Sequence, residues 1–230
     1  MQTFEDVVLT IPSESDKRFW KKYIYICLSF SAFLELDLKN NSLATQQISD
    51  LLQKLTQHKI NSKKTWLFGF RQLIRMNKVQ EARQLFGKSI GLSPHHKIFR
   101  SYLEFETQLG NFDRCEKLYK KWLQLFTESP EPWEEYLEFN SNLGKEDRVH
   151  AVFQLAVSGK FDLTQPEKIY KKYIDILTQW GQYEKVRQAY KDLLAKTGHI
   201  KVFLALGYFE HSVSQFDNMR EVFEKVVLCR

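Results

Sequence analysis

Hydrophobic residues recur along the chain with a short period of three to four residues and a long period of about 34. Large aromatic residues open five successive segments and are separated by 33, 34, 37 and 33 residues: Trp66, Phe99, Trp133, Tyr170 and Phe203. A second aromatic residue follows each of these after 20 positions: Phe86, Tyr119, Phe153, Tyr190 and Phe223. A fixed offset through five copies indicates an internal repeat, the sequence signature of stacked repeat architectures.

Each aromatic residue belongs to an apolar stripe with the spacing of an α-helix. The first stripe continues with mostly large or apolar residues at i+3 and i+4, as at Tyr136 and Leu137 after Trp133, and Tyr102 and Tyr173 also stand at i+3. At i+7 on the same face stand Leu73, Glu106, Asn140, Leu177 and Glu210. In one repeat the second stripe reads Cys115, Leu118, Tyr119, Trp122 and Leu123. Such spacing places the residues on one helix face. We therefore predict two helices per repeat, with the aromatic columns in the core rather than forming a base-stacking surface for RNA.

The residues between the stripes are those that end and begin helices. Glycines recur where a left-handed helix end is expected, at Gly110, Gly144 and Gly181. Acidic residues follow near the start of the second helix, at Asp113, Asp147, Glu184 and Asp217. Prolines separate the repeats, at Pro94, Pro130, Pro132 and Pro166. Each repeat is thus predicted to be a helix hairpin with a short turn.

These patterns predict an all-α fold, a right-handed superhelical solenoid of antiparallel helix pairs that forms one continuous domain. Residues 1–18 are expected to hold the second helix of a preceding repeat and a linker, and residues 19–60 a degenerate repeat. The further repeats are expected at 61–94, 95–130, 131–166, 167–199 and 200–230.

The composition fits a soluble helical protein: 43% of the 230 residues are hydrophobic, with 9 glycines and 5 prolines. No apolar run reaches the ~18 residues of a membrane span, and the N-terminus does not have the layout of a secretory signal. The three cysteines, Cys27, Cys115 and Cys229, are far apart, which favours a reducing compartment. We expect neither membrane association nor a small-molecule substrate.

The net charge is +6, and the basic residues are spread along the chain. They are interpreted as solvated helix faces, with a diffuse surface for RNA or acidic partners as the alternative. Within the stretch "GNFDRCEKLYKKWL", Arg114, Lys117, Lys120 and Lys121 are expected on the outward helix face and form a candidate partner-contact face. Cys115 occupies a column of small and medium apolar residues, so packing is predicted for it rather than reactivity.

Three motifs resemble chemical sites in one dimension. Gly87-Lys88-Ser89 lacks the first glycine and the leading strand of a phosphate-binding loop. His95 and His96 have no cysteine or carboxylate beside them at ligand spacing, so they are expected in an exposed loop. The carboxylates Glu104, Glu106, Glu134, Glu135 and Glu138 are expected on exposed helix faces, where nothing would separate their pKa values for catalysis. The sequence therefore predicts no catalytic, cofactor or metal site.

The aromatic-x-x-aromatic first helix, the acidic residue late in it and the "DR" before an aromatic second helix resemble HAT (half-a-tetratricopeptide) repeats. The stretches "FEDVVLTIPSESDKRFWKKYIYI", "ARQLFGKSIGLSP", "LGNFDRCEKLYKKWLQL" and "GHIKVFLALGYFE" are similar to the later repeats of the crooked-neck family of pre-mRNA splicing factors. The resemblance extends from about Phe4 to Val227.

This resemblance implies a nuclear, non-enzymatic scaffold of the nineteen complex, which holds other spliceosomal proteins together and has peripheral contact with snRNA or pre-mRNA. It implies no cofactor. Two alternatives stay open: a HAT scaffold of another RNA-processing complex, for mRNA 3′-end cleavage or rRNA processing, and a repeat module that binds RNA directly.

Overall fold

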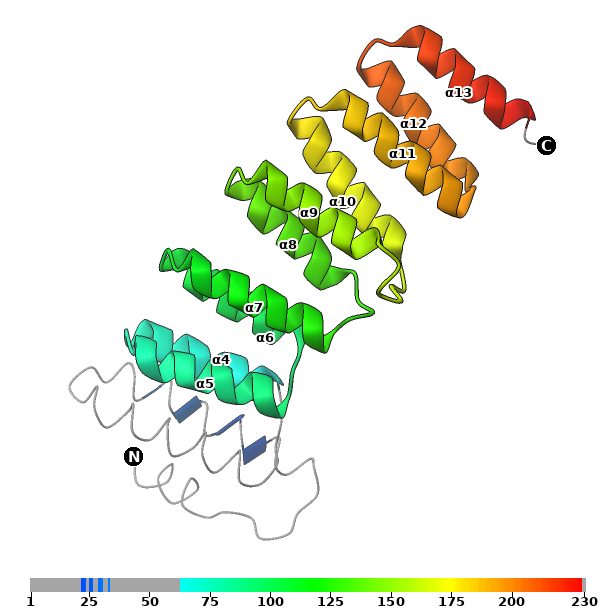
Figure 1. Ribbon diagram of the computed structural model, residues 1–230. Helices are drawn as coiled ribbons and strands as arrows, with labels where there is room; N and C mark the ends of the chain where they lie inside the picture. The colour runs from blue at the N-terminus through cyan, green and yellow to red at the C-terminus, as the bar shows by residue number, and fades with distance from the viewer. Residues whose placement is uncertain (1–21, 24, 27–28, 31–32, 34–62, 229–230) are drawn as a thin grey trace. The chain divides into compact units, whose positions relative to one another are not determined.

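A computed structural model describes residues 63–228 and, before them, residues 22–23, 25–26, 29–30 and 33. All regular structure in residues 63–228 is α-helical, which confirms the all-α prediction for this part of the chain (Figure 1). The part predicted at 1–18 and Cys27 lie outside the described residues, and only a few residues of the repeat predicted at 19–60 are described. The right-handed sense of the superhelix and the repeat boundaries stay predictions.

The helices follow one another in antiparallel pairs joined by short turns (Figure 1). The pairs are α4 (Lys63–Arg75) with α5 (Val79–Leu92), α6 (His96–Gln108) with α7 (Phe112–Leu125), α8 (Glu131–Asn142) with α9 (Glu146–Val157), α10 (Pro166–Gln179) with α11 (Tyr183–Thr197), and α12 (Ile200–Ser212) with α13 (Phe216–Leu228). Acidic residues stand in the first turn of α7, α9, α11 and α13, as predicted.

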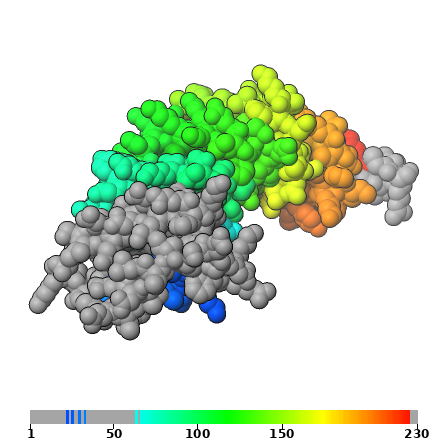
Figure 2. Space-filling view, turned by 90° about the horizontal axis from the view of Figure 1, so that it is seen from below, coloured from blue at the N-terminus to red at the C-terminus, as the bar shows by residue number. Residues whose placement is uncertain are grey.

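The chain divides into two compact units, Met1–Leu118 and Tyr119–Arg230, and the boundary falls inside α7. In the first unit, α4 packs on α5 and both contact α6. In the second unit, α10 packs against α8, α9 and α11, and α12 packs against α11 and α13. Side chains fill the space between neighbouring helices of each unit (Figure 2). Within a unit, each hairpin thus buries its apolar faces against the next hairpin, as repeat proteins do.

The turn inside each hairpin has a residue in the left-handed region. Gly110, Gly144 and Gly181 have φ angles of 71°, 65° and 69°, which confirms the predicted helix ends. The next amide then donates to the carbonyl five residues back, as Asn111 N does to Glu106 O at 2.9 Å. The acceptor is always the residue at i+7 from the opening aromatic, so the turn fixes the backbone of that position.

Aromatic rings stack between successive hairpins. The ring of Phe86 lies 4.3 Å from that of Tyr102, with an interplanar angle of 3°. Phe153 and Tyr173 stack in the same way, with centroids 3.7 Å apart. The two partners are the aromatic residue of a second helix and the i+3 residue of the following first helix. The faces of these rings are therefore occupied by one another inside the core.

The structure buries most of the aromatic residues predicted at repeat positions. The buried set is Trp66, Phe86, Phe99, Tyr102, Tyr119, Trp133, Tyr136, Phe153, Tyr170 and Tyr173. Tyr190, Phe203 and Phe223 are half-buried, and all three belong to the last two hairpins.

Candidate functional site

Among the described residues of the first unit, Glu106 stands out by its set of charged and hydrogen-bonding partners, and it lies near the end of α6. It stands seven residues after Phe99, so it shares the buried face of that helix. Its side chain is fully buried. An ionised carboxylate taken out of water is very unfavourable unless charged or hydrogen-bonding groups surround it, so its partners determine what it can do.

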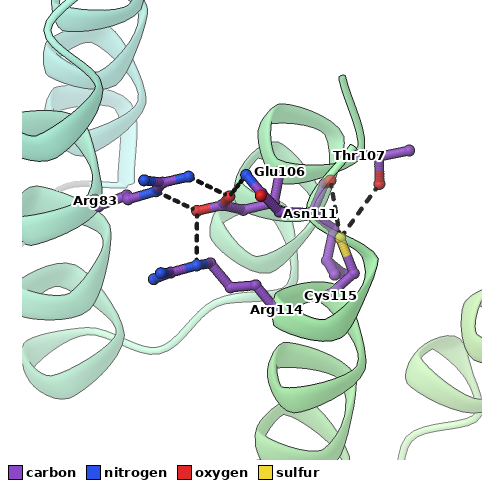
Figure 3. Close-up of polar contacts among 7 residues, drawn as sticks. Arg83, Glu106, Thr107, Asn111, Arg114 and Cys115 are labelled. Atoms are coloured by element: carbon purple, nitrogen blue, oxygen red, sulfur yellow. Dashed lines mark hydrogen bonds and ion pairs between the residues drawn. The ribbon is translucent and has the colours of Figure 1, made fainter. Parts of the chain in front are cut away.

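Four residues form what we call the Glu106 clamp: Arg83, Glu106, Asn111 and Arg114 (Figure 3). From α5, Arg83 donates through Nε to Glu106 Oε1 at 2.8 Å and through Nη2 to Oε2 at 2.9 Å. The amide of Asn111 donates to Oε2 at 2.9 Å, and Arg114 Nε of α7 lies 3.6 Å from Oε1. The two-pronged Arg83 contact has the geometry in which arginine binds carboxylates most strongly. The clamp joins one hairpin to the next.

The surroundings of Glu106 keep it ionised. Burial alone would raise the pKa of this carboxyl, but the hydrogen bonds from Arg83 and Asn111 and the positive charges of Arg83 and Arg114 outweigh burial and lower its pKa. A carboxylate with a depressed pKa and filled hydrogen-bonding positions is a poor general acid or base at neutral pH. The chemistry of the clamp is therefore structural.

The second unit contains a matching arrangement, the Glu210 clamp, made of Arg187, Glu210 and Asn218. Arg187 Nε and Nη2 donate to the two Glu210 oxygens at 2.7 and 2.8 Å, and the Asn218 amide lies 3.5 Å from Oε2. In both clamps the arginine precedes the glutamate by 23 residues and lies on the second helix of the preceding hairpin. The repeat thus reproduces a polar joint as well as an apolar core.

A third joint, between α9 and α10, has His150 in the arginine column and Leu177 in the glutamate column. Lys185 Nζ lies 2.8 Å from His150 Nε2. Because an ammonium group can only donate, Nε2 accepts, and the proton on Nδ1 is donated to the Tyr173 hydroxyl at 2.7 Å. Burial and the charge of Lys185 lower the pKa of His150, against a smaller opposite effect of nearby carboxylates. Burial raises the pKa of Tyr173 to about 12.

Cys115 lies beside the Glu106 clamp but faces the core. Its side chain is fully buried, which confirms the prediction of packing, and its Sγ lies 3.5 Å from the Thr107 hydroxyl (Figure 3). Burial raises the pKa of the thiol, and Glu106 adds to this increase while Thr107 partly offsets it. The thiol therefore stays protonated at neutral pH, in contrast to a nucleophilic cysteine.

The outer side of the same turn is open to solvent. A shallow depression of about 490 Å³ is lined by Gly110, Asn111, Phe112, Asp113, Arg114 and Lys117. Arg114 and Lys117 belong to the candidate partner-contact face predicted from the sequence, and Lys120 and Lys121 are also exposed on α7. Arg114 has a double role, since its guanidinium group contacts Glu106 while 49% of its side chain stays exposed.

Expectations of exposure are wrong for Glu106 and for His95, and Glu134 and Glu135 are half-buried rather than exposed. Glu106 is buried, because its i+7 spacing puts it on the core face and arginine compensates its charge. The signal that could have identified it is the pairing of Arg83 with Glu106 and of Arg187 with Glu210 at the same separation. The second error concerns His95, which is half-buried and caps α6 by accepting from Lys97 N at 3.2 Å.

The other motifs lie where their structural interpretation puts them. Gly87, Lys88 and Ser89 are inside α5, and the Ser89 hydroxyl donates to the Phe86 carbonyl at 2.8 Å. In the described part of the chain, no three histidine, cysteine or acidic side chains come together in a way that could hold a metal ion. Among the described helices, none has the length and apolarity needed to cross a membrane.

Comparison with known proteins places these repeats in a family. Residues 92–212 match the family model of the PRP39 C-terminal HAT repeat. "Crooked neck-like protein 1" of Mus musculus is 33% identical over 227 residues, which cover 97% of this chain and 33% of that protein. "Pre-mRNA-splicing factor cwf4" of Schizosaccharomyces pombe is 33% identical over 209 residues, covering 91% of this chain and 31% of that protein.

A third relative, "Pre-mRNA-splicing factor clf1" of Aspergillus fumigatus, is 33% identical over 212 residues, or 92% of this chain and 31% of that protein. The chain spans about a third of the length of these curated relatives. The helix hairpins and the family model agree with the matches along nearly the whole chain: this protein belongs to the HAT-repeat family, and within it the chain is similar to crooked-neck proteins.

Proposed function

We propose that this chain acts in the nucleus as a non-enzymatic scaffold in pre-mRNA splicing, where it holds proteins of the nineteen complex together through its helical-repeat surfaces. The observation that carries the proposal is the match of 91–97% of the chain to relatives named as crooked neck-like proteins and pre-mRNA-splicing factors. The partners and the mechanism proposed for this chain follow from its similarity to those relatives.

The geometry supports a scaffold rather than a catalyst. The clamps at Glu106 and Glu210 link successive hairpins by charge-assisted hydrogen bonds, which restrain their relative rotation within each unit. The two groups that most resemble catalytic residues, Glu106 and Cys115, are a fully paired carboxylate and a buried protonated thiol. The exposed cations of α7 leave a charged surface for binding acidic partners.

The test is affinity purification of the tagged full chain from nuclear extract, followed by mass spectrometry and detection of the U snRNAs. We expect nineteen-complex proteins and the spliceosomal snRNAs. A variant with Lys117→Glu, Lys120→Glu and Lys121→Glu should recover less of them, and it leaves Arg114 and the Glu106 clamp intact. A matched control, Arg220→Glu with Lys225→Glu on the exposed face of α13, should recover them as the unchanged chain does. Recovery of 3′-end cleavage or rRNA-processing factors instead would reject the splicing assignment.

A second candidate function, direct RNA binding, is favoured by the net charge of +6 and the exposed cations of α7. Contacts with phosphates strengthen at low salt because bound cations release counterions. Titration of a labelled single-stranded RNA at 50 and about 200 mM salt distinguishes the two candidates. Binding that weakens steeply with salt and is lost in the α7 variant would support an RNA contact, whereas no binding at low salt would exclude it.

A further inference from the structure

The first helix of the last hairpin, α12, exposes an apolar stripe. Ile200, Leu204 and Tyr208 are 60%, 37% and 70% exposed. They are four residues apart, so they lie on one face of the helix and extend over about 12 Å, at 1.5 Å per residue. The helix is therefore apolar on its solvent side as well as on its core side, which is unusual for a surface helix.

The corresponding positions of the other repeats are mostly polar. Counted from the opening aromatic, they are Lys63, Leu67 and Arg71 in α4; His96, Arg100 and Glu104 in α6; Pro130, Glu134 and Glu138 around α8; and Glu167, Lys171 and Asp175 in α10. Among these described helices, α12 is apolar at all three positions and the others are not. The stripe is thus a local departure from the repeat pattern rather than a requirement of the fold.

A further hairpin stacked after α13 would leave at least the Tyr208 end of this stripe uncovered. In α10 the equivalent residues Glu167, Lys171 and Asp175 are all exposed, although the α12–α13 hairpin follows in the same unit. The third position of the column is also exposed in the other described repeats, at Arg71, Glu104 and Glu138, whereas the first two positions are half-buried or buried in α4, α6 and around α8. Whatever covers Tyr208, the most exposed residue of the stripe, therefore comes from outside the stack of repeats.

The small apolar area of the stripe argues against a second copy of the chain as its binding partner. Three partly exposed side chains offer on the order of 300 Å² of apolar surface. A stable dimer buries roughly 800 Å² on each partner. A contact of this size suits a short segment of a larger protein that is also held at other surfaces, since tethering raises its effective concentration.

We propose that this stripe docks an amphipathic helical segment of a partner protein, with apolar residues along one face and carboxylates beside them. The apolar residues follow from the spacing of Ile200, Leu204 and Tyr208, which matches a two-turn helix lying along α12. With 70% of its surface exposed, Tyr208 is the expected anchor, since tyrosine is enriched at binding hot spots.

Charge determines the second property of the partner. The exposed face of α12 carries Lys201 and no carboxylate, because the single acidic residue of the helix, Glu210, is buried in its clamp with Arg187. Lys201 lies in the first turn, where the helix dipole is also positive. Carboxylates on the docked segment near the N-terminal end of α12 complement both the charge of Lys201 and the helix dipole. This surface is separate from the α7 face of the proposed function, and its test needs no assumption about splicing.

The fold itself supplies a matched variant. Replacing the stripe by the residues of α10, as Ile200→Glu, Leu204→Lys and Tyr208→Asp, gives α12 a surface that already exists on a folded repeat of the same unit. We expect its urea midpoint to equal that of the unchanged chain. As a control, Lys171→Ala alters the equivalent surface of α10 and should leave docking unchanged.

The occupant is identified by a photo-crosslinking amino acid placed at position 204 of the full chain in cells, with sequencing of the crosslinked peptide. We expect a segment with apolar residues at i, i+3 or i+4 and i+7 and with flanking Asp or Glu. A synthetic peptide of that segment should bind the purified chain, and the triple variant should weaken binding by about tenfold or more, as loss of hot-spot contacts does.

Several outcomes would overturn the proposal. They are a crosslink to a second copy of this chain, a crosslink to RNA, no crosslink above the level of the same amino acid at position 171, and binding of the peptide equally to the triple variant. Sedimentation of the purified chain adds an independent check, since a dimer that the triple variant dissociates would make the stripe a self-association surface. A negative result here leaves the purification test of the splicing function unaffected.

Discussion

A carboxylate such as that of Glu106 is unfavourable in a core, and the structure shows what compensates it. Arg83 binds both oxygens, Asn111 donates to one of them, and Arg114 lies close by. Buried ion pairs are seldom more stable than apolar residues of the same shape, but an uncompensated partner is costly. Leu177 in the same column shows that an apolar residue is also accepted there. The clamp therefore affects stability mainly through the penalty of leaving one buried charge without its partner.

The variant Arg83→Met should therefore destabilise the chain more than the removal of both partners. Arg83→Met leaves a buried carboxylate short of its main donor, at an expected ~3–5 kcal/mol. The double variant Arg83→Met with Glu106→Leu copies the apolar state of Leu177 and should recover most of that loss. Unfolding in urea measures both. The control is Lys172→Met, which breaks the partly exposed ion pair with Glu138 and should cost less than ~1 kcal/mol. If the losses of unfolding free energy in Arg83→Met and in Glu106→Leu alone add up to the loss in the double variant, the two residues are not coupled, which would contradict the clamp.

The joint at His150 should make stability depend on pH near neutrality. The native pKa of His150 is lowered, so between that value and the unfolded value of ~6.5 the unfolded chain binds more protons. Stability is therefore complete above the unfolded pKa and falls as the pH drops through it towards the native pKa. We expect a lower urea midpoint at pH 5.5 than at pH 7.5, measured by circular dichroism.

His150→Gln should flatten this difference, because a glutamine keeps polar contacts but does not titrate. His199→Gln, at an exposed position, is the control and should keep the pH dependence of the unchanged chain. An equal loss of pH dependence in both variants would mean that His150 is not the group responsible.

At the scale of the helix hairpin, the turns show how backbone conformation selects residues. Gly110 has a φ of 71°, and the equivalent residues of the α4–α5 and α12–α13 hairpins are Asn77 and Ser214, with φ of 58° and 60°. The left-handed residue brings the following amide onto the carbonyl of the i+7 residue, which closes the end of the first helix. The turns of the five described hairpins share this geometry although only three have glycine, so glycine is favoured there rather than required.

Two glycine substitutions should have opposite signs. A Cβ added at Gly110 or at Gly87 meets no atom within 4 Å, so packing is the same in both and only the backbone differs. Gly110→Ala forces alanine into the left-handed region and should cost ~1–2 kcal/mol. Gly87→Ala lies inside α5 and should stabilise by up to ~1 kcal/mol. Thermal unfolding of the two variants checks this, and a shift in the same direction for both would exclude a backbone origin.

The hairpins were predictable from sequence because their determinants are local. The spacing of Trp133, Tyr136 and Leu137 within one helix and the glycine at 144 each act over a few residues. The clamps depend on an arginine and a glutamate 23 residues apart on different hairpins, and local spacing cannot say whether such a pair compensates a buried charge. Glu106 was expected to be exposed because acidic residues usually are, although its i+7 position placed it on the core face.

At the scale of the whole molecule, the stability of each hairpin depends on its neighbours. In the second unit, Phe153 of α9 stacks on Tyr173 of α10, and Arg187 of α11 binds Glu210 of α12. Aromatic and polar contacts thus both cross from one hairpin to the next. Repeat proteins of this kind have stabilities that are sums of repeat and interface terms, so a defect should spread to adjacent repeats before distant ones.

Trp133 offers the sharpest test of this spreading. It opens α8, is 1% exposed and packs against Phe161, with ring centroids 5.2 Å apart. Trp133→Ala should cost ~3–5 kcal/mol through the cavity that it leaves. Because α10 packs on both α8 and α9, amide protection measured by hydrogen exchange should fall in α8, α9 and α10 together, and less in α4 and α5. Trp133→Phe keeps an aromatic ring and removes a buried Nε1–H that has no hydrogen-bond partner, so it should preserve most of the protection. Loss confined to α8, or equal loss in every described helix, would show that neighbouring hairpins are not coupled in this way.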